Sequence, residues 1–76
     1  MTFPMKNQVI KRAAEMAGSL VDDGYTIRIK VIMPATCFYK LRHKSNGSTI
    51  TIIGTYSVGR VRQFKNGKLK KTEDLT

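Results

Sequence analysis

The hydrophobic period of the chain changes at Gly24, and this change constrains the fold more than any other feature. Between Pro4 and about Asp23, apolar residues recur every three or four positions, which is typical of an amphipathic helix. Pro4 suits the first turn of such a helix, and Gly24 suits the left-handed position that ends one. After Gly24, apolar and polar residues alternate, which is typical of half-buried strands. The sequence therefore predicts one N-terminal helix followed by strands.

Four or five strands fit into the rest of the chain. The alternating segments are residues 25–33, 37–44, 48–54 and 60–64, with a short fifth strand at 68–71 as an option. Asn46-Gly47 and Asn66-Gly67 are hairpin signals because Asn and Gly both tolerate positive φ. Residues 54–59 fit either a turn or a bulged continuation of a strand. The expected fold is α+β, with one N-terminal helix packed on one face of a four- to five-stranded antiparallel sheet.

The size and the cysteine content narrow the class of protein. A chain of 76 residues has room for a single small domain, residues 1–76, with a loose C-terminal tail at about 72–76. Cys37 is the only cysteine, so no internal disulfide can form, which suits a reducing cytoplasm. The N-terminus lacks a signal peptide's apolar run, and no stretch approaches the roughly 18 to 20 apolar residues of a membrane span. We therefore expect a cytoplasmic protein.

Positive charge is concentrated in the strand region. The chain has 14 Lys and Arg against 5 Asp and Glu, a net charge of +9, and residues 24–72 contain eleven of these cations and no acid. A solvated surface normally mixes both signs, so the imbalance indicates a polyanionic partner. The simpler alternative is that the charge only keeps a small protein dispersed in water.

Strict alternation places many of the cations on the sheet face away from the helix. There they are interleaved with threonines and with two phenylalanines. Cations on neighbouring strands can contact successive phosphates, and exposed phenylalanines can stack on unpaired bases. We therefore expect binding to DNA or RNA, mainly through its phosphate backbone. The expected binding residues are Arg28, Lys30, Phe38, Lys40, Arg42, Lys44, Arg60, Arg62, Phe64 and Lys68.

Other partners fit the same surface. The main alternative is an acidic protein surface, on which the chain would act as an accessory or inhibitory factor and bury its phenylalanines and isoleucines as anchors. One helix, roughly 10–12 Å across, is also narrower than four or five strands. Either residues 1–3 or a second copy, in a homodimer through Ile32 and Ile53, would cover the remainder. An anionic membrane surface is disfavoured because the helix has few bulky apolar residues.

The sequence contains few residues that could form a catalytic or metal site. The five carboxylates lie near the ends of the chain, so a paired-carboxylate mechanism has no obvious residues. Cys37 and His43 supply only two of the three or four ligands that zinc needs. Residues six apart on one strand lie about 20 Å apart, too far for a Cys-His nucleophilic pair. We expect Cys37 in the core, a structural His43, and no enzyme activity, metal or cofactor.

One family resemblance concerns the first 53 residues. The sequence "DGY" after the helix, followed by strands containing "FYKLRHKSNGSTITI", resembles the double-stranded-RNA-binding-like fold of the HicA family of messenger-RNA-cleaving toxins. That family carries a strand histidine before a hairpin, so the resemblance implies RNA contact and, as a further alternative, RNA cleavage using His43. The family's Gly-Ser-His signature is missing, His43 does not occupy its place, and "RVRQFKNGKLKK" stands where the family has a closing helix.

Overall fold

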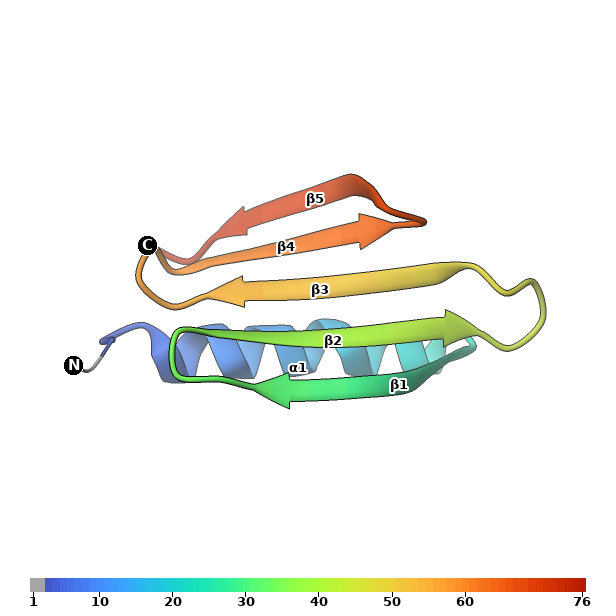
Figure 1. Ribbon diagram of the computed structural model, residues 1–76, viewed down its shortest axis with the longest axis horizontal. Helices are drawn as coiled ribbons and strands as arrows, with labels where there is room; N and C mark the ends of the chain where they lie inside the picture. The colour runs from blue at the N-terminus through green and yellow to red at the C-terminus, as the bar shows by residue number, and fades with distance from the viewer. Residues whose placement is uncertain (1–2) are drawn as a thin grey trace.

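The computed structural model describes residues 3–76 as one helix followed by five strands (Figure 1). The elements are α1 (Lys6–Asp22), β1 (Tyr25–Ile32), β2 (Thr36–His43), β3 (Thr49–Thr55), β4 (Arg60–Lys65) and β5 (Lys68–Asp74). The strands lie in the sheet in chain order, and each pairs antiparallel with the next. The α+β fold with one helix on an antiparallel sheet is therefore confirmed.

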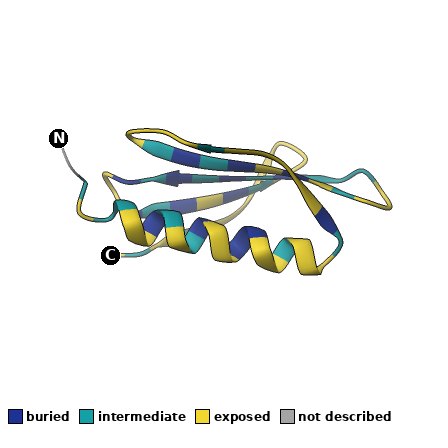
Figure 2. Cartoon of the chain, turned by 90° about the horizontal axis from the view of Figure 1, so that it is seen from below, coloured by how far each residue is buried: buried dark blue, intermediate teal, exposed yellow. Residues whose placement is uncertain are grey.

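The sheet has one covered face and one uncovered face. α1 runs along one face, behind β1 and β2 in Figure 1, and the edge-on view of Figure 2 shows it as a separate layer beside the sheet. The helix packs against β1 to β4, whereas the backbone of β5 lies beyond it. We call the face against α1 the helix face and the opposite face the open face. The helix itself is neither long nor apolar enough, over the residues described, to cross a bilayer.

The core lies between α1 and the helix face. It contains Val9, Ala13, Met16 and Ala17 from the helix, and Tyr25, Cys37, Tyr39, Leu41, Ile50, Ile52, Tyr56 and Val61 from the sheet and its turns. Full burial of one Leu or Ile side chain contributes about 1.5–3 kcal/mol. Helix and sheet approach closely at Gly54, where a Cβ would overlap Cγ1 of Val9 and lie 2.9 Å from Sγ of Cys37. The absence of a side chain at this position therefore sets how closely α1 packs.

The two Asn-Gly pairs form different turns. Asn66 and Gly67 have φ values of 51° and 84°, as a two-residue type I′ hairpin requires. At the first pair only Gly47 has positive φ, 73°, and residues 44–48 form a longer loop between β2 and β3. The alternatives for residues 54–59 are also resolved, because β3 continues to Thr55 and residues 56–59 form a turn.

Strict alternation fails in β1. The pairing of β1 with β2 shifts by one residue between Ile27 and Ile29, so Arg28 is the extra residue of a β-bulge. A shift of one residue turns every later side chain to the other side of the sheet. After the bulge, Ile29 and Val31 therefore belong to the open face, although strict alternation assigns them to the core.

The bulge also corrects two expected positions. Lys30 lies opposite Tyr39 and Ile32 lies opposite Cys37, and both partners face the helix. The expected position of Lys30 on the open face is therefore wrong. Ile32 and Ile53, the pair considered for a homodimer contact, lie on opposite faces of the sheet.

The C-terminal strand is longer than the sequence suggests. β5 continues through Asp74, so residues 72–74 belong to the sheet, where a loose tail is expected. Two ion pairs hold this end, Arg12 to Glu73 at 2.8 Å and Arg60 to Asp74 at 2.7 Å. The acids that end the chain are thus part of the folded sheet.

The N-terminal segment packs at one end of the core. Phe3 contacts the core cluster, and its ring centroid lies 6.2 Å from that of Tyr56. The hydroxyl of Tyr56 donates to the backbone oxygen of Thr36 at 2.9 Å. The expectation that residues 1–3 cover part of the sheet also involves Met1 and Thr2, which lie outside the described residues.

Candidate functional site

Six apolar side chains cross the middle of the open face. They are Ile29, Val31, Phe38, Ile53, Phe64 and Leu69, and together they involve all five strands. We call this set the apolar stripe. Ile29 and Leu69 are 42% and 56% exposed, while Phe38 and Phe64 are half-buried. The solvated face of an antiparallel sheet is normally polar, and apolar side chains that run across all the strands of such a face are typical of interaction surfaces.

Cations alternate with the two phenylalanines of the stripe. On β2 Lys40 follows Phe38 by two residues, and on β4 Arg62 precedes Phe64 by two. The register through β3 places Phe38 level with Arg62, and Lys40 level with Phe64. Each ring therefore has one cation about 7 Å away along its own strand and another about 10 Å away across the sheet, measured between backbone positions.

The cations of the open face differ in whether they already have a partner. Lys40, Arg42 and Arg62 are exposed, and none of the salt bridges within residues 3–76 involves them. Arg60 instead pairs with Asp74, so its charge is largely compensated. The structure therefore brings five expected binding residues together in an available form: Phe38, Lys40, Arg42, Arg62 and Phe64.

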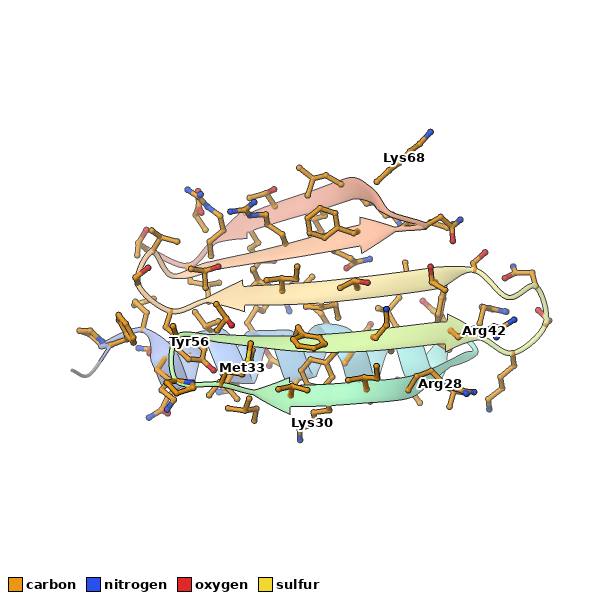
Figure 3. All side chains as sticks on the ribbon, viewed as in Figure 1. Arg28, Lys30, Met33, Arg42, Tyr56 and Lys68 are labelled. Carbon is orange, nitrogen blue, oxygen red and sulfur yellow. The ribbon has the colours of Figure 1, made fainter. Side chains whose placement is uncertain are left out.

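A pocket lies at one end of the open face, where the β1 bulge meets the β2–β3 loop. It has a volume of about 530 Å³ and is lined by Thr26, Arg28, Arg42, His43, Lys44, Ser45, Asn46 and Gly47. We call it the loop pocket. The expected binding residues Arg28 and Lys44 line it together with Arg42, and Figure 3 shows the two arginines on adjacent strands at the same end of the sheet.

Two expected binding residues lie elsewhere. The ammonium of Lys30 lies 5.9 Å from the centroid of the Tyr39 ring, a cation–π contact on the helix face. Lys68 projects away from β5 beyond the edge of the sheet (Figure 3). Neither residue adds to the cation group around the apolar stripe.

His43 is held by hydrogen bonds at both ring nitrogens. Nε2 lies 3.2 Å from the backbone oxygen of Asp23, and Nδ1 lies 3.2 Å from the backbone nitrogen and 2.9 Å from the hydroxyl of Ser45. One tautomer satisfies all three contacts, with Nε2 donating and Nδ1 accepting. The ring also packs edge-on against Tyr25 at 4.8 Å between centroids. These contacts are typical of a structural histidine that fixes the β2–β3 loop.

Cys37 is part of the core, as expected from its position on the strand. Its thiol is free and fully buried, and burial raises its pKa, partly offset by a hydrogen bond with Tyr56. A buried, protonated thiol is a poor nucleophile. Within residues 3–76, no group of three or more His, Cys, Asp or Glu side chains is placed to hold a metal ion.

Hydrophobic alternation in the sequence does not predict all residues of the apolar stripe and the loop pocket. It missed Ile29 and Val31 because the bulge has no signature in the sequence. It also missed the role of residues 45–47, since their Asn-Gly signal predicts a tight two-residue turn rather than a loop beside a pocket. The absence of acids from residues 24–72 was the one available sign that a basic pocket could form there.

No family model matches this chain, and no curated protein or solved structure is significantly similar to it. The resemblance to the HicA-type fold ends after β3, because "RVRQFKNGKLKK" forms most of β4 and β5. Over the described residues, the sheet is thus extended where that fold has its closing helix. The apolar stripe and the loop pocket are the features from which a function can be inferred.

Proposed function

We propose that the protein binds nucleic acid through the open face, without catalysis, and that single-stranded segments are its preferred form. The observation that carries this proposal is the alternation of Phe38 and Phe64 with Lys40 and Arg62 at the centre of the face. Stacking on aromatic rings needs unpaired bases, and the neighbouring cations suit the phosphates that link those bases. A duplex presents its phosphates but not the faces of its bases.

The spacing of the two phenylalanine rings fits an extended single strand of nucleic acid. Phe38 and Phe64 are two strands and two residues apart, which corresponds to about 12 Å between backbone positions. This distance exceeds the spacing of about 3.4 Å between stacked neighbours in one strand. The rings would therefore contact different bases of an unstacked strand, with Thr51 and Ile53 of β3 beneath the nucleotides between them.

A second candidate function follows from the apolar stripe itself. Six apolar side chains, two of them more than 40% exposed, are more than backbone binding to nucleic acid requires. An acidic protein partner would bury this stripe and pair with the surrounding cations. Protein interfaces are usually less dependent on salt than phosphate contacts are, and this difference separates the two functions.

The test is fluorescence polarisation with matched single- and double-stranded DNA and RNA at several salt concentrations. If Lys40, Arg42, Arg62 and one cation of the loop pocket each contact a phosphate, log affinity for a single strand should fall with log salt at a slope of about −3. Single strands should bind more tightly than duplexes of the same sequence. A salt-independent affinity, or no binding to any of the four ligands, contradicts the proposal.

The proposed setting is the cytoplasm, where single-stranded RNA is abundant and thiols stay reduced. The free Cys37 thiol supports this assignment because it takes part in no disulfide. Imaging of a fluorescently tagged chain against a compartment marker would test it.

A further inference from the structure

The loop pocket has a different chemistry from the apolar stripe. Its lining includes Arg28, Arg42, Lys44 and the hydroxyl-bearing Thr26, together with His43 and residues 45–47, but no carboxylate and no large apolar side chain. The hydroxyl of Ser45 already donates to Nδ1 of His43. The pocket is therefore suited to a small anion rather than to a base or an apolar anchor. Arginine is the side chain best matched to phosphate oxygens, because its planar group donates two parallel hydrogen bonds.

Two structural features assemble the pocket before any ligand arrives. The β1 bulge adds Arg28 to the strand next to β2, so that Arg28 and Arg42 line the same pocket. The loop backbone at Gly47 lies close to Arg42, since a Cβ on Gly47 would be 3.5 Å from Nη2 and 3.8 Å from Nε. The course of β1, β2 and the loop thus brings both arginines to one pocket.

Hydrogen bonds to His43 hold the β2–β3 loop. The ring nitrogen Nδ1 of this residue accepts from the backbone nitrogen and lies 2.9 Å from the hydroxyl of Ser45, and the backbone nitrogen of Gly47 donates to the backbone oxygen of His43 at 3.2 Å. The side chain of Asn46 accepts from the backbone nitrogen of Ser48 at 2.9 Å. These bonds hold Lys44 and Ser45 at the mouth of the pocket.

We propose that the loop pocket binds a phosphate monoester, namely the terminal phosphate of a strand that lies on the open face. This inference rests on the proposed function. A monoester carries a charge of about −1.5 to −2 and three free oxygens, whereas an internal diester has one charge and two free oxygens. Donors that converge from β1, β2 and the loop match the monoester better. Arg42, which belongs to both the open face and the pocket, connects the strand to its terminus.

The pocket is tested first with inorganic phosphate alone. In a two-dimensional NMR titration of the ¹⁵N-labelled protein at constant ionic strength, the amides of residues 44–47 should shift and saturate with phosphate but not with chloride. Replacing Arg28 by Ala should weaken this response at least fivefold, since it removes one of two guanidinium groups. Lys11→Ala, which removes the same charge from an exposed helix position, should leave it unchanged. The absence of a saturable shift in the wild-type protein overturns the site.

The terminal phosphate is tested with single-stranded oligonucleotides of one sequence that carry a 5′-phosphate, a 3′-phosphate or neither. One of the phosphorylated forms should bind about tenfold more tightly than the unphosphorylated form. This preference should disappear in Arg28→Ala and persist in Lys11→Ala. Equal affinity for all three forms overturns the terminal-phosphate inference but leaves the proposed function standing. A phosphate response at the loop without any oligonucleotide binding overturns the proposed function and this inference together.

Discussion

The two faces of the sheet use the same strands for different purposes. On the helix face, Leu41, Ile50 and Ile52 are at most 1% exposed and are sealed by α1. On the open face, the residues that alternate with them form the apolar stripe and its cations, which remain accessible. Buried side chains that stabilise the fold thus alternate with accessible ones along the same strands, so neighbouring residues should respond differently to substitution.

The packing of α1 on the helix face can be tested at Gly54. Gly54→Ala places a methyl group into the side chain of Val9 and within 2.9 Å of the Cys37 sulfur, and both of these neighbours are fully buried. We expect a loss of about 2–3 kcal/mol in the free energy of unfolding, measured by urea denaturation.

Gly18 provides a matched control for this substitution. It lies exposed on α1, and a Cβ there would meet no atom within 4 Å. Gly18→Ala should therefore stabilise the protein by about 0.5–1 kcal/mol through helix propensity. Equal effects of the two substitutions would contradict the packing described for Gly54.

Phe38→Ala on the open face should reduce binding more than stability. It removes one aromatic ring on which a base can stack, so it should weaken single-stranded nucleic acid binding by about 1–2 kcal/mol, roughly tenfold, with little change in the salt slope. Unfolding should be affected less than by Gly54→Ala, because Phe38 is only half-buried. Polarisation and urea denaturation on the same sample measure both effects. A loss of stability larger than the loss of affinity would place Phe38 in the core instead.

Two lysines, Lys40 and Lys30, differ mainly in the face of the sheet that they occupy. Lys40 lies on the open face, two residues after Phe38 on β2 and level with Phe64 on β4. Lys30 lies over Tyr39 on the helix face. Lys40→Ala should reduce the salt slope for single strands by about 0.7, the value for one phosphate contact. Lys30→Ala removes the same charge and should leave the slope unchanged. An equal reduction of the salt slope in both variants would mean that only the net charge of the protein determines its binding.

This pair also shows how far sequence patterns reach. The helix, the strands from β2 to β4 and the directions of their side chains follow from hydrophobic period, and five expected binding residues do meet on the open face. Lys30 does not, because a single bulge at Arg28 reverses the later part of β1. A bulge depends on how two strands fit against each other, and the alternation within one strand carries no information about that fit.

The two Asn-Gly pairs give a second measure of predictability. Asn66-Gly67 forms the expected two-residue turn, whereas Asn46-Gly47 belongs to a five-residue loop. The longer loop is held by contacts with the end of the helix segment, from His43 to the backbone oxygen of Asp23 and from the backbone nitrogen of Lys44 to the backbone oxygen of Gly24. The loop pocket depends on these contacts, so it could not be predicted from the local signal.

The smallest expected change in stability concerns β5, whose end forms an ion pair on each face of the sheet. On the helix face Arg12 binds Glu73 through two hydrogen bonds, 2.8 Å and 3.1 Å long, and on the open face Arg60 binds Asp74. The bond from Arg12 lowers the pKa of Glu73, and the nearby charges of Arg12 and Lys71 lower it further. A carboxylate with a lowered pKa stabilises the folded state above its unfolded pKa, and that contribution disappears as the pH falls through the folded pKa.

Glu73→Gln should therefore cost less than about 1 kcal/mol at pH 7, and the difference from wild type should shrink as the pH falls below the ordinary Glu pKa of about 4.3 and through the lowered pKa of the folded state. Melting temperatures at pH 7 and pH 3 measure the change. In an Arg12→Gln background, Glu73→Gln should have a smaller effect at pH 7 than in the wild type, because only the weaker contact of Glu73 with Lys71 remains. If the cost of Glu73→Gln is the same at pH 3 as at pH 7, the carboxylate does not act through its charge, and the end of β5 is held on the helix face by packing alone.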